Sequence, residues 1–143
     1  NDPNIIMTDY AVGDPLKELY SNCGLFVLPS HTEGLSLSLL EALSIGARCL
    51  VSDIPENTVV ADIYGAAFTP EDTDDLARAL ERECAQEYPD AMRQQQIQYI
   101  HTNFEYKVML DRYEEVYHHV VGDPLKAMPS TLKKEKVPAG AKA

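Results

Sequence analysis

The sequence predicts an α/β fold in which a parallel sheet carries helices on both faces. Short apolar runs alternate with amphipathic segments along the first half of the chain. The runs are apolar throughout, as is typical of parallel strands that are covered on both sides, and each strand–helix–strand crossover should be right-handed. In such sheets ligands bind beyond the carboxyl ends of the strands. We therefore expect a site in the loops that follow Leu28 and Val51.

The expected strands are the apolar runs at 5–8, 25–28, 48–52 and 66–68. Between the first two, Asp14 is suited to cap a helix that has Pro15 at its first position. A second helix is expected from Leu35 to Ile45, with Gly46 as its stop. A short helix should follow at 58–64 and end at Gly65.

Beyond Pro70 the pattern becomes helical, with apolar residues at spacings of three and four. Helices are expected at 74 to about 87, 90 to about 101 and 104 to about 120. We expect two regions: 1–121, a partial lobe with C-terminal helices, and 122–143, a basic tail. The chain starts at Asn1 without a methionine, so we also expect it to be part of a longer protein.

Charge separates these two regions. The 143 residues carry a formal net charge of −11, and residues 123–143 hold five lysines against two acids, or +3, which leaves −14 on the first 122. An acidic surface disfavours binding to nucleic acid through phosphate contacts. The apolar content of 45% argues against disorder of the whole chain, and no apolar run is long enough to span a bilayer. The tail is either a plain solvated extension or a contact with an anionic membrane surface.

The three cysteines form no C-x-x-C pair. Cys23 and Cys49 border apolar runs, which indicates free thiols in a reducing compartment. We therefore expect a cytoplasmic protein. The basic tail leaves open that it is peripheral to the membrane.

The informative stretch is a strand, a loop and a helix between Leu28 and Leu43. This arrangement presents backbone amides to an anion at a helix N-terminus. Glu33 lies in the loop, and Glu41 lies eight residues later inside an otherwise apolar helix, where an unsatisfied acid would be costly. Two acceptor oxygens suit a vicinal diol such as ribose. The alternative is that Ser38 and Glu41 form a capping box and that Glu33 is a solvent-exposed loop acid.

His31 and Glu33 form an H-x-E pattern without a third nearby ligand. Zinc sites need three or four protein ligands, so we expect no metal here. Gly-rich Walker and GxGxxG patterns are also absent, and we expect no cofactor.

Five segments resemble one family in order along the chain. The run from Ile6 to Tyr10 stands where the family has its "xFxG" strand end. Leu16-x-x-Leu19-Tyr20 matches its helix, the run from Leu25 to Ser30 its "vfvlPS" strand, Glu33-x7-Glu41 its E-x7-E motif, and the run from Gly46 to Asp53 its next strand. From about residue 5 to 103, the chain thus resembles the C-terminal lobe of a GT-B fold, GT4-type (glycosyl transferases group 1) retaining glycosyltransferase, a Rossmann-like lobe.

The resemblance implies transfer of a sugar from a nucleotide-sugar donor to an acceptor sugar or glycolipid with retention, in polysaccharide biosynthesis or a related pathway. It implies that Glu33 contacts the donor sugar as the catalytic residue and that Glu41 binds the ribose. It also implies that backbone amides contact the sugar and the diphosphate, at Gly34, Leu35, Ser36 and Leu37. The nucleobase is implied to lie beside Tyr10 and Leu16.

Departures from the family pattern include serine at positions 36 and 38, where glycine and proline are usual. The cations that hold the donor diphosphate, and the acceptor-binding N-terminal lobe, lie upstream of this segment in the family. We therefore expect these residues alone to be inactive and to need the missing lobe as a partner. Two other interpretations stay open: a sugar-nucleotide epimerase of the same fold, and a non-enzymatic interaction or assembly module.

Overall fold

The computed structural model describes residues 2–122 of the chain. It contains three strands, six α-helices and one 3₁₀ turn, in the following order: α1 (Asp14–Asn22), β1 (Phe26–Leu28), α2 (Leu37–Ser44), β2 (Cys49–Ser52), α3 (Pro55–Ala61), η1 (Asp62–Tyr64), β3 (Gly65–Phe68), α4 (Thr73–Ala85), α5 (Asp90–Phe104) and α6 (Tyr106–Val120). The chain divides into two compact units, the first ending at Thr102 and the second beginning at Asn103. Apart from Gly122, the predicted basic tail lies outside the described residues.

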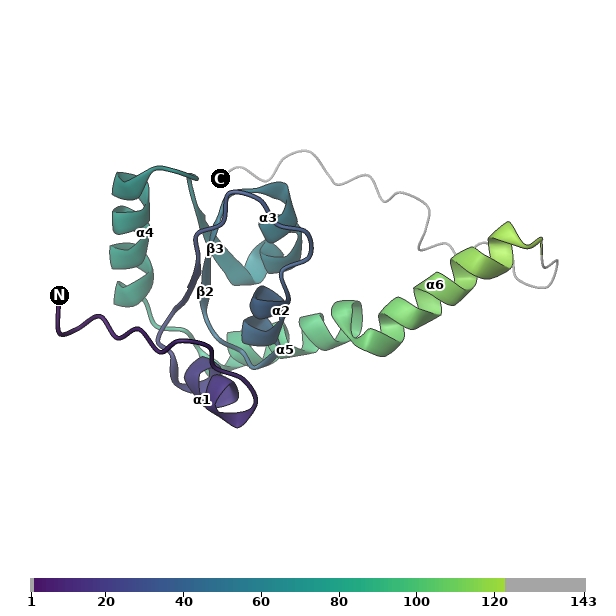
Figure 1. The fold of residues 1–143 in the computed structure, drawn as a ribbon, viewed down its shortest axis with the longest axis horizontal. Coiled ribbons are helices and arrows are strands. Elements are labelled where there is room, and N and C mark those ends of the chain that lie inside the picture. Colours follow the sequence, from purple (N-terminus) through teal and green to yellow (C-terminus); the bar gives the residue numbers. More distant parts are fainter. Residues whose placement is uncertain (1, 123–143) are drawn as a thin grey trace. The chain divides into compact units, whose positions relative to one another are not determined.

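The strands form one parallel sheet in the order β1-β2-β3, with Val27 opposite Leu50 and Leu50 opposite Ala66. Helix α4 covers one face of this sheet, and α2 and α3 cover the other (Figure 1). The predicted fold class is therefore confirmed.

Both faces of the sheet are packed because successive side chains of β2 point to opposite sides. Leu50 is buried with Phe68 and with Ala79 of α4. Its neighbours in β2 are buried too, as are the inward residues of α2 and α3, which are Leu39, Ala42, Leu43, Val60 and Ala61.

The predicted strand at 5–8 is wrong. This segment has no regular secondary structure, and the side chains of Ile5, Ile6 and Met7 are 68%, 80% and 85% exposed. A strand needs a neighbour for its backbone hydrogen bonds. Among the described residues, β1 pairs with β2 alone. The apolar run at 5–8 therefore has no neighbouring strand to pair with.

Helix boundaries differ from expectation where a cap decides them. Helix α2 begins at Leu37 because Ser36 is its N-cap, and α4 begins at Thr73 because the Asp72 side chain caps it. Helix α3 begins at Pro55, since proline at a first helical position loses no hydrogen bond. A 3₁₀ turn then continues from α3 to Gly65.

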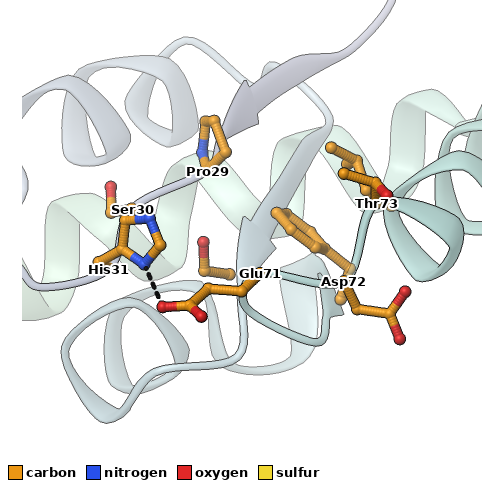
Figure 2. Close-up of a pocket in the computed structure, with 9 residues that line it drawn as sticks. Pro29, Ser30, His31, Glu71, Asp72 and Thr73 are labelled. Atoms are coloured by element: carbon orange, nitrogen blue, oxygen red, sulfur yellow. Dashed lines mark ion pairs between the residues drawn. The ribbon is translucent and has the colours of Figure 1, made fainter.

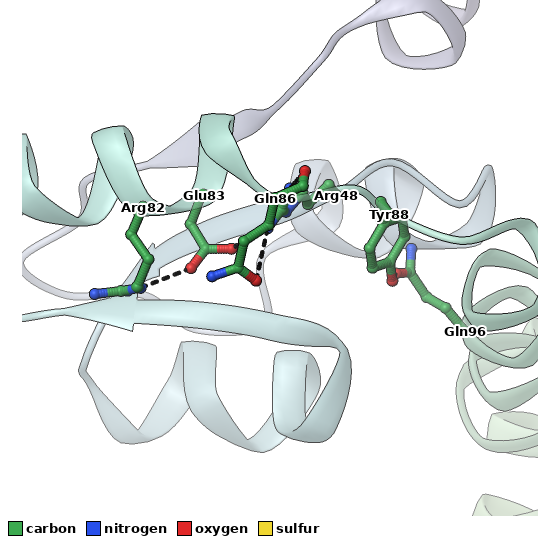
Figure 3. Close-up of polar contacts among 6 residues, drawn as sticks. All are labelled: Arg48, Arg82, Glu83, Gln86, Tyr88 and Gln96. Atoms are coloured by element: carbon green, nitrogen blue, oxygen red, sulfur yellow. Dashed lines mark hydrogen bonds and ion pairs between the residues drawn. The ribbon is translucent and has the colours of Figure 1, made fainter.

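Two side chains, Arg48 and Gln96, make the polar contacts that connect α4, α5 and the segment between them to the start of β2 and the end of α2 (Figure 3). Arg48, just before β2, has its Nη2 atom 2.8 Å from Oε2 of Glu83, and both side chains are only 10% exposed. The Nη1 atom of Arg48 also donates to the carbonyl oxygen of Gln86 at 2.6 Å. The fully buried Gln96 of α5 donates to the carbonyl oxygens of Leu43 and Ala47, at the end of α2 and just before β2.

Gly46 permits the sharp exit from α2, because its φ is +82° and a Cβ there would collide with the Arg93 side chain. We expect Gly46→Ala to lower the free energy of unfolding by about 1–3 kcal/mol, from left-handed strain and displacement of Arg93. Urea denaturation followed by circular dichroism measures this loss. Gly24→Ala is the matched control, since a Cβ at Gly24 meets nothing within 4 Å. An equal effect of the two substitutions would contradict the assignment.

Candidate functional site

The loop between β1 and α2 carries most of the predicted site residues. Ser36 is 5% exposed, and its hydroxyl accepts a hydrogen bond from the Leu39 amide at 3.4 Å, which fixes where α2 begins. The first amides of a helix lack intrahelical acceptors and point out of its N-terminus. Gly34, Leu35 and Leu37 are exposed in this stretch, so their backbone is open to a ligand.

Glu33 is held by a side chain that the sequence analysis did not single out. The Ser30 hydroxyl donates to Oε1 of Glu33 at 2.6 Å, and both residues are half-buried. A short hydrogen bond to a carboxylate restricts its rotation. Glu33 is therefore an oriented group and not a freely solvated loop acid.

Glu41 is exposed on α2, so the expected cost of burying its charge does not arise. The capping-box alternative is wrong, because Ser36 is the N-cap and Ser38 lies inside the helix. Instead the Glu41 carboxylate faces Tyr20, the buried residue of α1. Burial, followed by the charge of Glu41 and a hydrogen bond to it, raises the pKa of Tyr20 above its usual value.

The Tyr20 ring is itself fixed by an edge-on contact with Phe26 of β1, at 5.6 Å between ring centroids. Tyr20 thus connects α1 to β1, and its pKa responds to the charge of Glu41 on α2. The helix in which Tyr20 lies could be read from the sequence, but its contact with Glu41 could not, because the two are far apart in the chain.

The other two predicted site residues, Tyr10 and Leu16, lie outside the loop between β1 and α2. Tyr10 lies in the extended N-terminal segment with a side chain that is 90% exposed, and Leu16 is half-buried on α1. The structure thus shows both as surface or partly covered groups near the start of the chain. Their assignment to the nucleobase stays a prediction.

A cavity of about 170 Å³ opens beyond the carboxyl ends of all three strands (Figure 2). It is lined by the loops after β1 and β3, the ends of β2 and β3 and the first turn of α4. The lining residues are Pro29, Ser30, His31, Ser52, Phe68, Glu71, Asp72, Thr73 and Leu76. The predicted location in the loop after β1 is therefore hollowed, and Ser30 belongs both to this cavity and to the contact with Glu33. The sequence analysis missed the contribution of the β3–α4 loop.

His31 lies at the rim of this cavity, with Nδ1 3.2 Å from Oε1 of Glu71 and both side chains more than 70% exposed. Glu71 adopts a φ of +64°, which turns the chain from β3 toward the capped start of α4. His31 therefore pairs with the β3–α4 loop and not with Glu33. Within residues 2–122 no group of three or more His, Cys, Asp or Glu side chains is arranged to hold a metal ion.

The thiols are free among the described residues, with Cys49 buried, Cys23 half-buried and Cys84 exposed. Burial raises the pKa of the Cys49 thiol beyond its ordinary range, so this group is an inert part of the core.

Comparison with known proteins shows what this architecture belongs to. The family model for glycosyl transferases group 1 matches residues 1–86, which is more than half of the chain. The chain belongs to this family. The resemblance inferred from the Glu33–Glu41 motif and its flanking strands is confirmed.

Two curated relatives are similar to part of the chain. The serotype-specific mannosyltransferase WbdA of Escherichia coli is 40% identical over 78 residues, which is 54% of this chain and 10% of the relative. An N,N'-diacetylbacillosaminyl-diphospho-undecaprenol alpha-1,3-N-acetylgalactosaminyltransferase of Campylobacter jejuni is 50% identical over 38 residues, 27% of this chain and 10% of the relative. The chain thus spans about a tenth of each relative, and no solved structure matches it.

No helix in the described part of the chain is long and apolar enough to cross a bilayer.

Proposed function

We propose that this family member is the donor-binding part of a glycosyltransferase that moves a sugar from a nucleotide-sugar donor to an acceptor with retention of configuration. The observation that carries the proposal is the placement of the two motif acids around one helix start. Glu33 is oriented by Ser30 before α2, and Glu41 is placed against Tyr20 on α2 itself. Glu33 thus stands directly before the backbone amides of residues 34–37, and Glu41 stands one helical turn after them.

In this proposal Glu41 accepts hydrogen bonds from the two ribose hydroxyls of the donor. Its exposure on α2 leaves the carboxylate open to such a ligand. Glu33 contacts a hydroxyl of the donor sugar, while the amides from Gly34 to Leu37 face the diphosphate. Amide dipoles directed at the departing diphosphate stabilise the charge that develops as the glycosidic bond breaks. Tyr10 and Leu16 would lie beside the nucleobase.

The acceptor would be a sugar or glycolipid in polysaccharide biosynthesis, and the protein would act in the cytoplasm. The first 122 residues carry −14 by sequence, which is unfavourable for a diphosphate unless cations from another lobe complete the site. We therefore infer that the missing N-terminal lobe is a required partner and that these 143 residues alone transfer no sugar. No metal or organic cofactor has a part in this proposal, and nucleic acid is not an expected partner.

One observation favours the non-enzymatic alternative, in which the domain serves in assembly. Within the described residues, the outer edge of β1 has no partner strand, and such an edge is a template for pairing. A sugar-nucleotide epimerase would also bind its nucleotide on this fold, but nothing in the geometry of the two acids favours it.

Isothermal titration of the 143-residue chain with UDP, GDP and ADP sugars tests the proposal. We expect weak binding of one nucleotide class at millimolar concentration. Glu41→Ala should raise its Kd at least about tenfold, because hydrogen bonds to a charged group contribute roughly 1.5–3 kcal/mol. Glu81→Ala, which removes an exposed acid of α4, is the matched control and should leave Kd unchanged.

Equal binding by the Glu41 and Glu81 variants would overturn the role of Glu41. Binding of nothing at millimolar ligand by the wild-type chain would show that donor recognition depends on segments outside it. Robust sugar transfer by these residues alone would contradict the inferred need for a second lobe.

A further inference from the structure

The cavity beyond the carboxyl ends of the strands lies apart from the groups proposed to contact the donor. Glu33, residues 34–37 and Glu41 are not among the residues that line it. Its volume of about 170 Å³ is close to that of a cavity that holds one six-membered ring, since a cavity of about 150 Å³ takes up benzene. The cavity therefore has room for a second group of that size.

The walls of this cavity combine an apolar surface with hydroxyl groups (Figure 2). Phe68 at the end of β3 is only 5% exposed, and Leu76 of α4 packs against the same core cluster. Pro29 adds to this apolar surface. Three hydroxyl groups from different elements face the same space: Ser30, Ser52 and Thr73. An apolar surface with a few placed polar groups is the usual composition of a small-molecule site.

Hydrogen bonds within the walls determine what kind of ligand the serine hydroxyl groups can meet. Ser30 donates its proton to Oε1 of Glu33 at 2.6 Å. Ser52 donates its proton to the carbonyl oxygen of Leu28 at 3.3 Å. A hydroxyl group has one proton and two lone pairs, so both serine oxygens are left to act as acceptors. A ligand in this cavity must therefore supply hydrogen-bond donors.

The charges around the cavity disfavour a phosphate group. Among the described residues that line it there is no lysine or arginine, whereas Glu71 and Asp72 add two carboxylates. Glu71 is paired with His31, at 3.2 Å between Oε1 and Nδ1. An anion would be repelled by the carboxylates and would bring only acceptors. A metal ion is also disfavoured, because no group of three or more ligating side chains is present in residues 2–122.

An uncharged sugar ring has the properties that these walls require. Its hydroxyl groups donate as well as accept hydrogen bonds, and its C–H groups form an apolar surface that suits Phe68 and Leu76. We propose that the cavity binds one uncharged sugar ring of the acceptor. Ser30 belongs both to the cavity wall and to the contact with Glu33, so a ring held here lies beside the donor sugar. The assignment to the acceptor thus rests on the proposed function.

Two-dimensional amide NMR spectra of the 143-residue chain, titrated with the methyl glycosides of glucose, galactose and mannose, test the proposal. We expect at least one glycoside to shift the signals of Ser30, Ser52 and Thr73. Its Kd should be millimolar, because a ligand of about a dozen heavy atoms binds weakly. Inorganic phosphate, ethylammonium and cyclohexylmethanol should leave these signals unchanged at the same concentration.

Three results of this titration would overturn the proposal. One is the absence of glycoside shifts at the cavity. Another is a set of shifts confined to residues 34–41, since the ring would then occupy the position of the donor sugar. The third is stronger binding of ethylammonium or cyclohexylmethanol than of every glycoside, since the cavity would then select a cation or a plain apolar ring.

Substitutions at Thr73 test the cavity directly. Its side chain is exposed at the start of α4, so the fold should tolerate changes there. Thr73→Val removes the hydroxyl group and should raise the Kd of the glycoside about threefold to tenfold. Thr73→Trp should fill the cavity and abolish the shifts. The same two substitutions at Thr102, an exposed threonine near the end of α5, are the matched controls and should leave Kd unchanged. Wild-type Kd values for both Thr73 variants would contradict the proposal.

UDP, GDP and ADP sugars titrated into the same sample separate this proposal from the donor site. Their shifts should appear at residues 34–41 and should be weakened by Glu41→Ala but not by Thr73→Val. Nucleotide-sugar shifts without glycoside shifts would overturn the cavity proposal and leave the donor site standing. Glycoside shifts without any nucleotide-sugar shifts would instead overturn the donor site of this chain, and with it the assignment of the ring to the acceptor.

Discussion

Arg48→Met is expected to lower the free energy of unfolding by roughly 2–4 kcal/mol, because it leaves Oε2 of the nearly buried Glu83 carboxylate without a cation. Arg82 still pairs with Oε1 of Glu83 at 2.9 Å, so the charge is not left wholly uncompensated. Both atoms Nε and Nη2 of Arg48 donate to Oε2 of Glu83, at 3.2 and 2.8 Å. The Arg48 guanidinium also lies 5.8 Å from the centre of the Tyr88 ring. Removal of the guanidinium therefore removes contacts to the C-terminal end of α4 and to the segment that leads to α5. Urea denaturation measures the loss.

Two companion variants separate a buried ion pair from a general effect of lost charge. Arg78→Met removes an exposed arginine that is 3.2 Å from Asp75, and an exposed pair contributes about 0–1 kcal/mol. Arg48→Met combined with Glu83→Leu should recover most of the stability, since an apolar pair replaces the charges together. A loss below about 1 kcal/mol for Arg48→Met, no larger than for Arg78→Met, would refute the structural role of the pair.

Gln96→Ala should be the second severe substitution, with a loss of roughly 2–4 kcal/mol. The Gln96 side chain is fully buried, and Nε2 donates to the carbonyl oxygens of Leu43 and Ala47 at 2.9 and 3.0 Å. Its Oε1 accepts a hydrogen bond from the Tyr88 hydroxyl (Figure 3). Alanine takes one donor from each carbonyl oxygen, which keep the Gly46 amide and the Cys49 thiol as their other donors. It also removes the acceptor of the Tyr88 hydroxyl and creates a cavity between α5 and the end of α2.

Gln96→Leu keeps most of the volume and so isolates the hydrogen-bond contribution, for which we expect a loss of about 1–3 kcal/mol. The matched control is Gln95→Ala, one residue earlier on the exposed side of α5, which should change stability by less than about 0.5 kcal/mol. Thermal and urea unfolding would show these differences. Similar stabilities of the Gln95 and Gln96 variants would mean that the polar contacts of Gln96 contribute nothing.

The acids of the candidate site were predictable, but their partners were not. Glu33 and Glu41 are only eight residues apart, between a predicted strand and a predicted helix, so the sequence is enough to select them. Their orientation depends on Ser30, whose hydroxyl reaches Glu33 through the local loop shape, and on Tyr20, which reaches Glu41 only when α1 packs beside α2. No periodicity or motif encodes those contacts.

The cavity shows the same division. The rule for parallel sheets predicts a ligand at the carboxyl ends of the strands, and the loop after Leu28 does line a cavity there. The contribution of Glu71, Asp72 and Thr73 became visible only with the β3 register known, because that register brings the β3–α4 loop beside Ser30 and His31.

By itself, the sequence determined the fold class, the apolar strands that form the sheet, the order of the helices and the two acids of the family motif. These depend on local composition and spacing, which adjacent residues carry. Only the tertiary structure decided that 5–8 forms no strand, that Glu41 is exposed, and that Arg48 and Gln96 hold the segment after α4 against the sheet. Each of these depends on a neighbour distant in the chain, because strand pairing, burial and ion pairing are properties of two segments together and not of one.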